Sequence, residues 1–233
     1  MNLSQLNRIL LLSSLIGTSA MATELEISID NLTHGNHFTP VLLAAHGSDT
    51  HLFSVGEMAS SSLQKMAEGG DIADLASLIE GANGITLSNP ANGLMAPGQR
   101  VDAIMLDSQT MTHLSMVAMI LPTNDAFVGL DAWAIPTTPG TYTIDLNGYD
   151  AGTEANDEVI NGGGMPGVPG IPAAPGGNGG ANATGISDMS SNDKVHIHPG
   201  VLGDTDLNGG MSDLDSRVHR WLNPVARIVV TVK

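Results

Sequence analysis

Two aspartates lie where strand-like stretches of the sequence give way to turns. Asp125 closes the turn Thr-Asn-Asp between two apolar stretches, and Asp150 opens the segment DAGTE directly after a third. Strand ends can meet at one edge of a β-sandwich, and Glu154 can curl back to the same edge because Gly152 makes the bend easy. Calcium takes about six to eight oxygen ligands, several of them carboxylates, from loops of this kind. These residues therefore form a candidate calcium site.

A purely structural role is the alternative for the same two aspartates. Aspartate favours turns because its side chain accepts a hydrogen bond from a backbone amide two residues ahead. Asp125 and Asp150 would then cap their turns and bind nothing. On the residues alone, turn capping is the better-supported interpretation.

A second acidic segment has the pattern with which an EF-hand loop begins. Residues 204–209 read DTDLNG, in which oxygen-bearing side chains alternate as they do in such a loop. The twelfth position, however, holds Asp215 in place of the longer glutamate, and the flanking residues do not predict the required helices. We expect a solvated turn here.

The histidines suggest a different metal chemistry. His196 and His198 alternate along an expected strand, so both imidazoles point to one face and can serve as a pair of zinc or copper ligands. The spacing marks no third ligand, and packing or hydrogen-bonding roles are the more common ones for such residues. The pair supports an alternative hypothesis, in which the chain is a periplasmic metal-carrying protein or enzyme.

The sequence contains no motif that indicates catalysis. A GxSxG elbow, an HExxH zinc motif and a P-loop are all absent. The chain has no cysteine, which excludes thiolate nucleophiles, disulfides and cysteine-ligated metals. We therefore expect a binding protein that is not an enzyme.

Composition narrows the possible partners. Of the 233 residues, 24 are acidic and 8 are basic, which gives a net charge of −16. Such a chain has no basic surface to neutralise the phosphates of nucleic acid or an anionic membrane, whereas hard cations suit its carboxylates. Hydrophobic residues make up 42% and aromatic residues only 3%, so aliphatic side chains must build most of the core.

The first 22 residues have the form of an export signal. Arg8 precedes an apolar run at residues 9–16, and residues 20–22 (AMA) fit a peptidase site with cleavage before Thr23. The run is far shorter than the roughly 20 residues that span a bilayer, and no later segment of the mature chain is long enough. We expect a secreted or periplasmic protein with one domain over residues 23–233.

The mature chain has the pattern of short strands interrupted by a helical insert. A helix is expected from Val55 to Glu68, because Ser54 and Glu57 have capping-box spacing, and a shorter one after Asp71. Strands are expected at residues 24–30, 100–106, 113–121, 126–133, 141–146, 194–198 and 225–232, and a further short helix at 214–222.

The remaining segments are expected to be irregular. Residues 34–50 show no clear period, and residues 162–185 are rich in Gly and Pro. The latter composition predicts a mobile loop within the domain that folding does not need. Many short strands separated by turn formers predict an all-β fold, an antiparallel β-sandwich.

Four stretches resemble the spondin amino-terminal domain of F-spondin and mindin. In family order they are NHFTPVLLAAHGSDTHLFSVGEMAS (36–60), LSMVAMILPTNDAFVGLDAW (114–133), YDAGTEANDE (149–158) and NPVARIVVTV (223–232). The resemblance implies an antiparallel β-sandwich with a calcium ion near one end. Animal members are extracellular-matrix and cell-adhesion proteins, so the resemblance also implies an extracellular role.

By this resemblance, the ion is held by Asp125, by Asp150 and by an acid on the preceding strand. Asp107 is the nearest acid to that third position, offset by one residue, and Asp131 is a reserve candidate. Glu154 stands where the family's loop ends in aspartate, and the chain lacks the cysteines and thrombospondin-type repeats of animal members. The chain resembles a bacterial exported member of the family.

The sequence therefore predicts an exported calcium-binding β-sandwich module for adhesion or matrix interaction. Its expected partner is an extracellular or cell-surface protein or glycan, and neither nucleic acid nor a membrane span is expected. The alternative remains a periplasmic metal-carrying protein or enzyme that uses His196 and His198.

Overall fold

The computed structural model describes residues 23–177, 179–187 and 192–233, so the expected signal peptide lies outside the described residues. These residues form ten strands and two helices. In chain order the elements are β1 (Glu24–Asn31), β2 (His37–Phe38), β3 (Leu42–His46), α1 (Ser61–Gly69), α2 (Ala73–Gly81), β4 (Ile85–Ser88), β5 (Arg100–Asp107), β6 (His113–Leu121), β7 (Ala126–Ala134), β8 (Gly140–Asp150), β9 (His196–Ile197) and β10 (Ala226–Val232).

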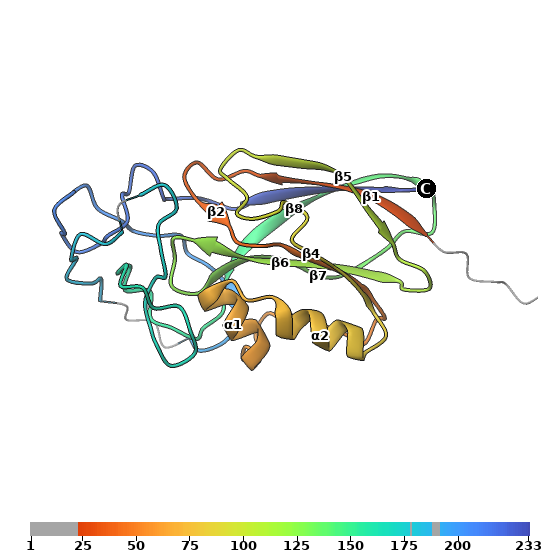
Figure 1. Ribbon diagram of the computed structural model, residues 1–233, viewed down its shortest axis with the longest axis horizontal. Helices are drawn as coiled ribbons and strands as arrows, with labels where there is room; N and C mark the ends of the chain where they lie inside the picture. The colour runs from red at the N-terminus through yellow and green to blue at the C-terminus, as the bar shows by residue number, and fades with distance from the viewer. Residues whose placement is uncertain (1–22, 178, 188–191) are drawn as a thin grey trace, which may run out of the picture.

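The strands pair antiparallel in the order β4-β3-β6-β7-β8-β10-β1-β5, with β2 on β6 and β9 on β8. The long strand β8 joins the two halves, because residues 140–146 pair with β10 and residues 147–150 pair with β7. Figure 1 shows the result as two layers, with β1, β5 and β10 above β4, β6 and β7, and both helices on the outer face of the lower layer. The prediction of an all-β antiparallel fold is confirmed.

The lower layer is buried on both faces, because one apolar cluster lies between the two layers and another lies between the lower layer and the helices. Along β6, Met116, Ala118 and Ile120 point between the layers, whereas Val117 and Met119 point toward the helices. This follows from the period of two in a strand, combined with a covering layer on each side. The strand is therefore a continuous apolar run, which the sequence shows as well.

The N-terminus of α1 differs from the prediction. The helix begins at Ser61, because Ser60 is the residue whose hydroxyl accepts the amide of Leu63 (3.1 Å). Ser54 instead begins a turn in which its carbonyl accepts the amide of Glu57 (3.1 Å). The predicted start at residue 55 is wrong, because Ser54 has the capping-box spacing but Ser60 is the residue that caps the helix.

Other segments were also assigned wrongly. Residues 34–50 are not irregular, since they contain β2 and β3, and β4 was not expected at all. Residues 214–222 form no helix. They make hydrogen-bonded turns in which the Asp215 carbonyl accepts the amides of Val218 (3.0 Å) and His219 (2.9 Å).

The Gly- and Pro-rich segment has no helix or strand in its described part, but it is anchored to the core. Ile171 is fully buried among the side chains between the layers. Its amide donates to the Val159 carbonyl (3.0 Å), and its carbonyl accepts the amide of Asn161 (3.3 Å). We therefore no longer expect the whole of residues 162–185 to be dispensable for folding.

Long loops gather at one end of the molecule. The described residues of 151–222, apart from β9, form this loop lobe, which lies at the left of Figure 1, away from the C-terminus. Within the described ranges, no helix has both the length and the apolar character that crossing a membrane requires. The lobe begins where β8 ends, at Asp150.

Candidate metal centre

The pairing of β7 with β8 brings the two predicted aspartates together. Ala126, the first residue of β7, stands opposite Asp150, the last residue of β8, so that Asp125 directly precedes this pair. The Asp125 carbonyl also accepts the amide of Ala151 (3.3 Å). Both aspartates are buried, Asp125 completely and Asp150 to within 2%. The antiparallel register thus places two carboxyl groups at one end of the sandwich.

The two carboxylate oxygens of Asp125 have different roles. Oδ2 accepts the amide of Thr153 (2.8 Å), the hydroxyl of Thr153 (3.2 Å) and the amide of Glu154 (3.2 Å). Oδ1 is buried and has no hydrogen-bond partner. One oxygen therefore caps the following loop, as turn capping predicts, and the other remains available to a ligand.

The carboxylate of Asp150 is held from two sides. Oδ1 accepts the amide of Gly152 (2.8 Å), and Oδ2 accepts the side-chain amide of Asn156 (2.8 Å). The Nε2 atoms of His196 and His198 lie 3.8 and 3.9 Å from the same Oδ2. No local pattern in the sequence indicates this proximity, because β9 joins β8 from 46 residues further along the chain.

The electrostatics of the aspartate pair favour a bound proton or cation. Burial raises the pKa of Asp125 to about 7, and the negative charge of Asp150 adds to the effect, while the hydrogen bonds from Thr153 and Glu154 partly oppose it. Two like charges this deeply buried repel each other in a medium that screens them poorly. A divalent cation would offset both costs.

The side-chain hydrogen bonds of Glu154 are directed away from the aspartate pair. Its Oε2 accepts the amide of Gly170 (2.8 Å) and lies 3.4 Å from the side-chain amide of Asn124. Burial raises the pKa of Glu154 to about 7, and the charge of Glu68 contributes to this rise. The hydrogen bond that Glu154 makes to Asp125 comes from its backbone amide (3.2 Å).

Asp107 and Asp131 lie elsewhere. Asp107 pairs with Glu24 at the start of β1, whereas the aspartate pair lies beyond the other end of the same strands. Its Oδ1 accepts the amide of Gln109 (2.8 Å). Asp131 holds the loop before α1, since Oδ2 lies 2.5 Å from His51 Nδ1 and Oδ1 accepts the amide of Leu52 (2.8 Å).

The hydrogen bonds of the histidines argue against a two-histidine zinc or copper site. His198 Nδ1 accepts the amide of Gly200 (2.9 Å), so the proton of the neutral ring is on Nε2, the atom that faces Asp150. His196 Nδ1 lies 2.8 Å from the Lys194 carbonyl and must donate, which leaves only its own Nε2 free of hydrogen. Only one of the two imidazoles therefore presents a lone pair.

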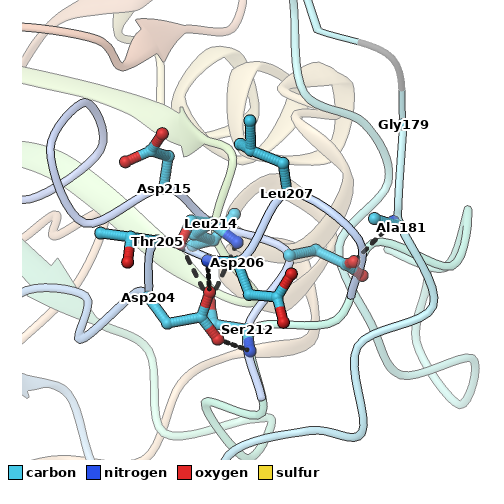
Figure 2. Close-up of a pocket in the computed structure, with 10 residues that line it drawn as sticks. Gly179, Ala181, Asp204, Thr205, Asp206, Leu207, Ser212, Leu214 and Asp215 are labelled. Carbon is cyan, nitrogen blue, oxygen red and sulfur yellow. Dashed lines mark hydrogen bonds between the residues drawn. The ribbon is translucent and has the colours of Figure 1, made fainter. Parts of the chain in front are cut away.

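The EF-hand-like segment lines a pocket, and its own backbone amides occupy the carboxylate of Asp204 there (Figure 2). Asp204 Oδ2 accepts the amides of Met211 (2.8 Å) and Ser212 (3.0 Å), and Oδ1 accepts that of Asp206 (2.8 Å). Figure 2 shows the carboxylates of Asp206 and Asp215 directed to different sides. The arrangement is that of a turn, as the sequence predicted.

In the part of the chain that the structure describes, no three His, Asp or Glu side chains come together as a group ready to hold a metal ion. The aspartate pair offers two carboxylates, one with an unpartnered buried oxygen, and this chemistry suits a hard cation such as calcium. Any further oxygens would have to come from the backbone or from water.

Sequence reasoning missed two buried acids, Glu68 and Glu158. One feature of the sequence could have marked Glu68 as unusual. It lies in the last turn of α1, where the helix dipole disfavours a negative charge. Glu158 has a left-handed backbone (φ 58°), which is uncommon for a residue other than glycine and which no sequence pattern indicates.

Comparison with known families gives one match. A family model described as Spondin_N matches residues 30–158, more than half of the chain. The matched residues include both aspartates of the pair and end at Glu158, so most of the loop lobe and β10 lie beyond them. No curated protein matches the chain.

Proposed function

Because the chain belongs to the spondin N-terminal domain family, we propose that it is an exported calcium-binding β-sandwich module for adhesion or matrix interaction. Asp125 and Asp150 hold the ion. Domains of this family are extracellular. The export signal expected in residues 1–22 agrees with that location.

The observation that carries the calcium proposal is the unpartnered Oδ1 of Asp125 beside Asp150. A buried carboxylate oxygen without a partner is costly, and a second buried carboxylate next to it raises the cost. A divalent cation bound by both groups supplies the missing partner and removes the repulsion. It also fixes the loop of residues 151–158, on which the loop lobe is built.

The loop lobe is the part of the module to which we assign partner binding. It exposes large apolar side chains, among them Leu202, Leu207, Met211 and Leu222. Exposed apolar groups in mobile or long loops are typical of interaction surfaces. An extracellular or cell-surface protein or glycan that binds there would depend on calcium, because the ion anchors the base of the lobe.

We propose no catalytic role. A Ser–His pair exists, in which Ser115 Oγ lies 2.7 Å from His46 Nε2, but both residues are completely buried. Ser115 also accepts the amide of Ala132 (2.8 Å), at a point where the pairing of β6 and β7 is irregular. The pair stabilises a distortion of the sheet and has no access to a substrate.

The calcium proposal is tested by thermal unfolding of the mature chain in chelator and in calcium. A ligand that binds only the folded state stabilises it by about 2.7 kcal/mol at a hundredfold excess over Kd. For a chain of this size, that corresponds to a rise in Tm of roughly 5–10 °C. Asp125→Asn and Asp150→Asn should abolish most of the rise.

Asp107→Asn is the matched control, because it removes the same charge at the opposite end of the strands. An equal loss of the calcium response in Asp107→Asn, or an unchanged Tm for the wild type in calcium, would refute the site. Adhesion is tested separately by cell attachment to surfaces coated with wild type or Asp150→Asn, with and without calcium. Attachment that ignores both calcium and the substitution would show that the ion has no part in it.

A further inference from the structure

A buried carboxylate, Glu68, and a half-buried one, Glu154, form a second acidic pair apart from Asp125 and Asp150. Glu68 of α1 is 1% exposed, and its Oε1 accepts the side-chain amide of Gln64 (2.8 Å), while its Oε2 is buried without a partner. Glu154 likewise has one engaged oxygen, Oε2, and one buried oxygen without a partner, Oε1. Each residue therefore has one carboxylate oxygen free for a ligand.

Three segments meet at this pair. The backbone of α1 touches the Gly- and Pro-rich segment, since a Cβ on Gly164 would lie 2.5 Å from the Glu68 carbonyl. The same segment donates the amide of Gly170 to Glu154 (2.8 Å), which itself belongs to the loop after β8. The pair thus joins α1 and the β8 loop, both inside the family match, to residues 164–170 beyond it.

The charges that raise the pKa of Glu154 are all negative. Burial has the largest effect on the pKa of Glu154 and raises it, and the negative charge of Glu68 raises it further. The last turn of α1 contains no basic residue, and its free carbonyl groups add partial negative charge beside Glu68. Among the described residues, neither carboxylate forms an ion pair with Lys, Arg or His; the nearby Lys65 is bound to Asp74 (2.6 Å).

We propose that Glu68 and Glu154 hold a second hard cation, calcium in an extracellular setting, between α1 and the loop lobe. The free oxygens, Glu68 Oε2 and Glu154 Oε1, are the first ligands, and backbone carbonyls or water complete the shell. Hard cations prefer such oxygens, and calcium tolerates an irregular set of them. The ion would fasten the segment beyond the family match to the part of the chain that the family model covers, independently of the Asp125–Asp150 site.

The test is the number of calcium ions bound per mature chain, measured by equilibrium dialysis at pH 8. Wild type should bind two equivalents, Glu68→Gln one and Asp125→Asn one, and the double variant none. Glu80→Gln, which removes an exposed acid from α2, is the matched control and should still bind two. Glu154→Gln should behave as Glu68→Gln does, which covers the case in which one of the variants does not fold.

Hydrogen exchange of residues 163–172 provides the second measurement. Calcium should slow exchange there at least tenfold in wild type and in Asp125→Asn, but not in Glu68→Gln. The proposal would be overturned if Glu68→Gln and Glu154→Gln both still bind two calcium ions per chain. It would also be overturned if the wild type binds only one calcium ion and Asp125→Asn binds none. A Glu68→Gln variant that is merely more stable in chelator, with unchanged stoichiometry, would identify a shared proton and also overturn it. A single equivalent lost in Glu68→Gln and kept in Asp125→Asn would support this site and reject the other.

Discussion

Glu158 accepts the hydroxyl of Ser212 at 2.6 Å, and both side chains are buried. The same carboxylate accepts the amides of Leu202 (2.6 Å) and Gly203 (2.8 Å), so the last residue of the family match holds residues about fifty positions further along. Asp213 acts similarly on the amides of Ile160 (2.8 Å) and Ala181 (2.6 Å). The chain has no cysteine and so no disulfides. Carboxylates that accept backbone amides connect distant segments instead, and part of the acidic excess has this structural role.

Replacing Glu158 with Ala should destabilise the protein by roughly 3 kcal/mol or more, because hydrogen bonds to a buried charged group contribute about 1.5–3 kcal/mol each and the donors would be left unsatisfied. Urea unfolding followed by circular dichroism measures this. Glu57→Ala, at an exposed acid, is the control and should change stability by less than about 0.5 kcal/mol. Equal effects of the two substitutions would show that Glu158 does not anchor the lobe.

Ile171 should matter although it lies in a segment of Gly and Pro. Truncation of a fully buried isoleucine costs about 2–5 kcal/mol, so Ile171→Ala should lower Tm by several degrees. Val168→Ala, at a side chain that is 47% exposed in the same segment, should leave Tm nearly unchanged. If Ile171→Ala melts as wild type does, the segment is as dispensable as its composition suggests.

The strands with a clear pattern could be predicted to within a few residues, as β1, β6 and β10 illustrate. β3 could not, because both of its faces are covered and LLAAH shows no alternation. Asp125 and Asp150 were found because residues next to strand ends share an edge when the strands are neighbours. The Glu68–Glu154 pair was not, since it depends on how α1 packs against a distant loop, and no local pattern carries that information.

The start of α1 gives a direct test of two competing signals. Ser60→Ala should cost about 1 kcal/mol, because it removes the side-chain oxygen that accepts the Leu63 amide. Ser54→Ala should cost much less, since only the carbonyl of Ser54 takes part in its turn. Equilibrium unfolding of both variants distinguishes them, and a larger loss for Ser54→Ala would place the helix start where the capping-box pattern predicted it.

Without calcium, the protein should lose stability as the pH rises from about 4 to 7. The pKa values of Asp125 and Glu154 are raised to about 7 in the folded state and return to their ordinary values, near 4, on unfolding. Between these limits the two carboxyl groups bind more protons in the folded state than in the unfolded state, so they make the free energy of unfolding fall with increasing pH. The lowered pKa values of His37 and His219, which burial causes, act in the opposite direction below about pH 6.5, but the pKa values of the two carboxyl groups rise to about 7 and set the overall trend. The lowered pKa of Asp204 affects stability only below this window.

Calcium should reverse that trend, because the ion replaces protons that leave as the pH rises. Tm measured in calcium-free buffer at pH 5, 6, 7 and 8 should fall, whereas the calcium-induced increase in Tm should grow over the same series. Asp125→Asn carries no titrating group at that position. It should therefore reduce the fall of the calcium-free Tm with pH and remove most of the calcium-induced increase in Tm. Calcium-free curves with the same slope in wild type, Asp125→Asn and Glu154→Gln would mean that neither acid has a raised pKa in the folded state, and both cation sites would lose their electrostatic basis.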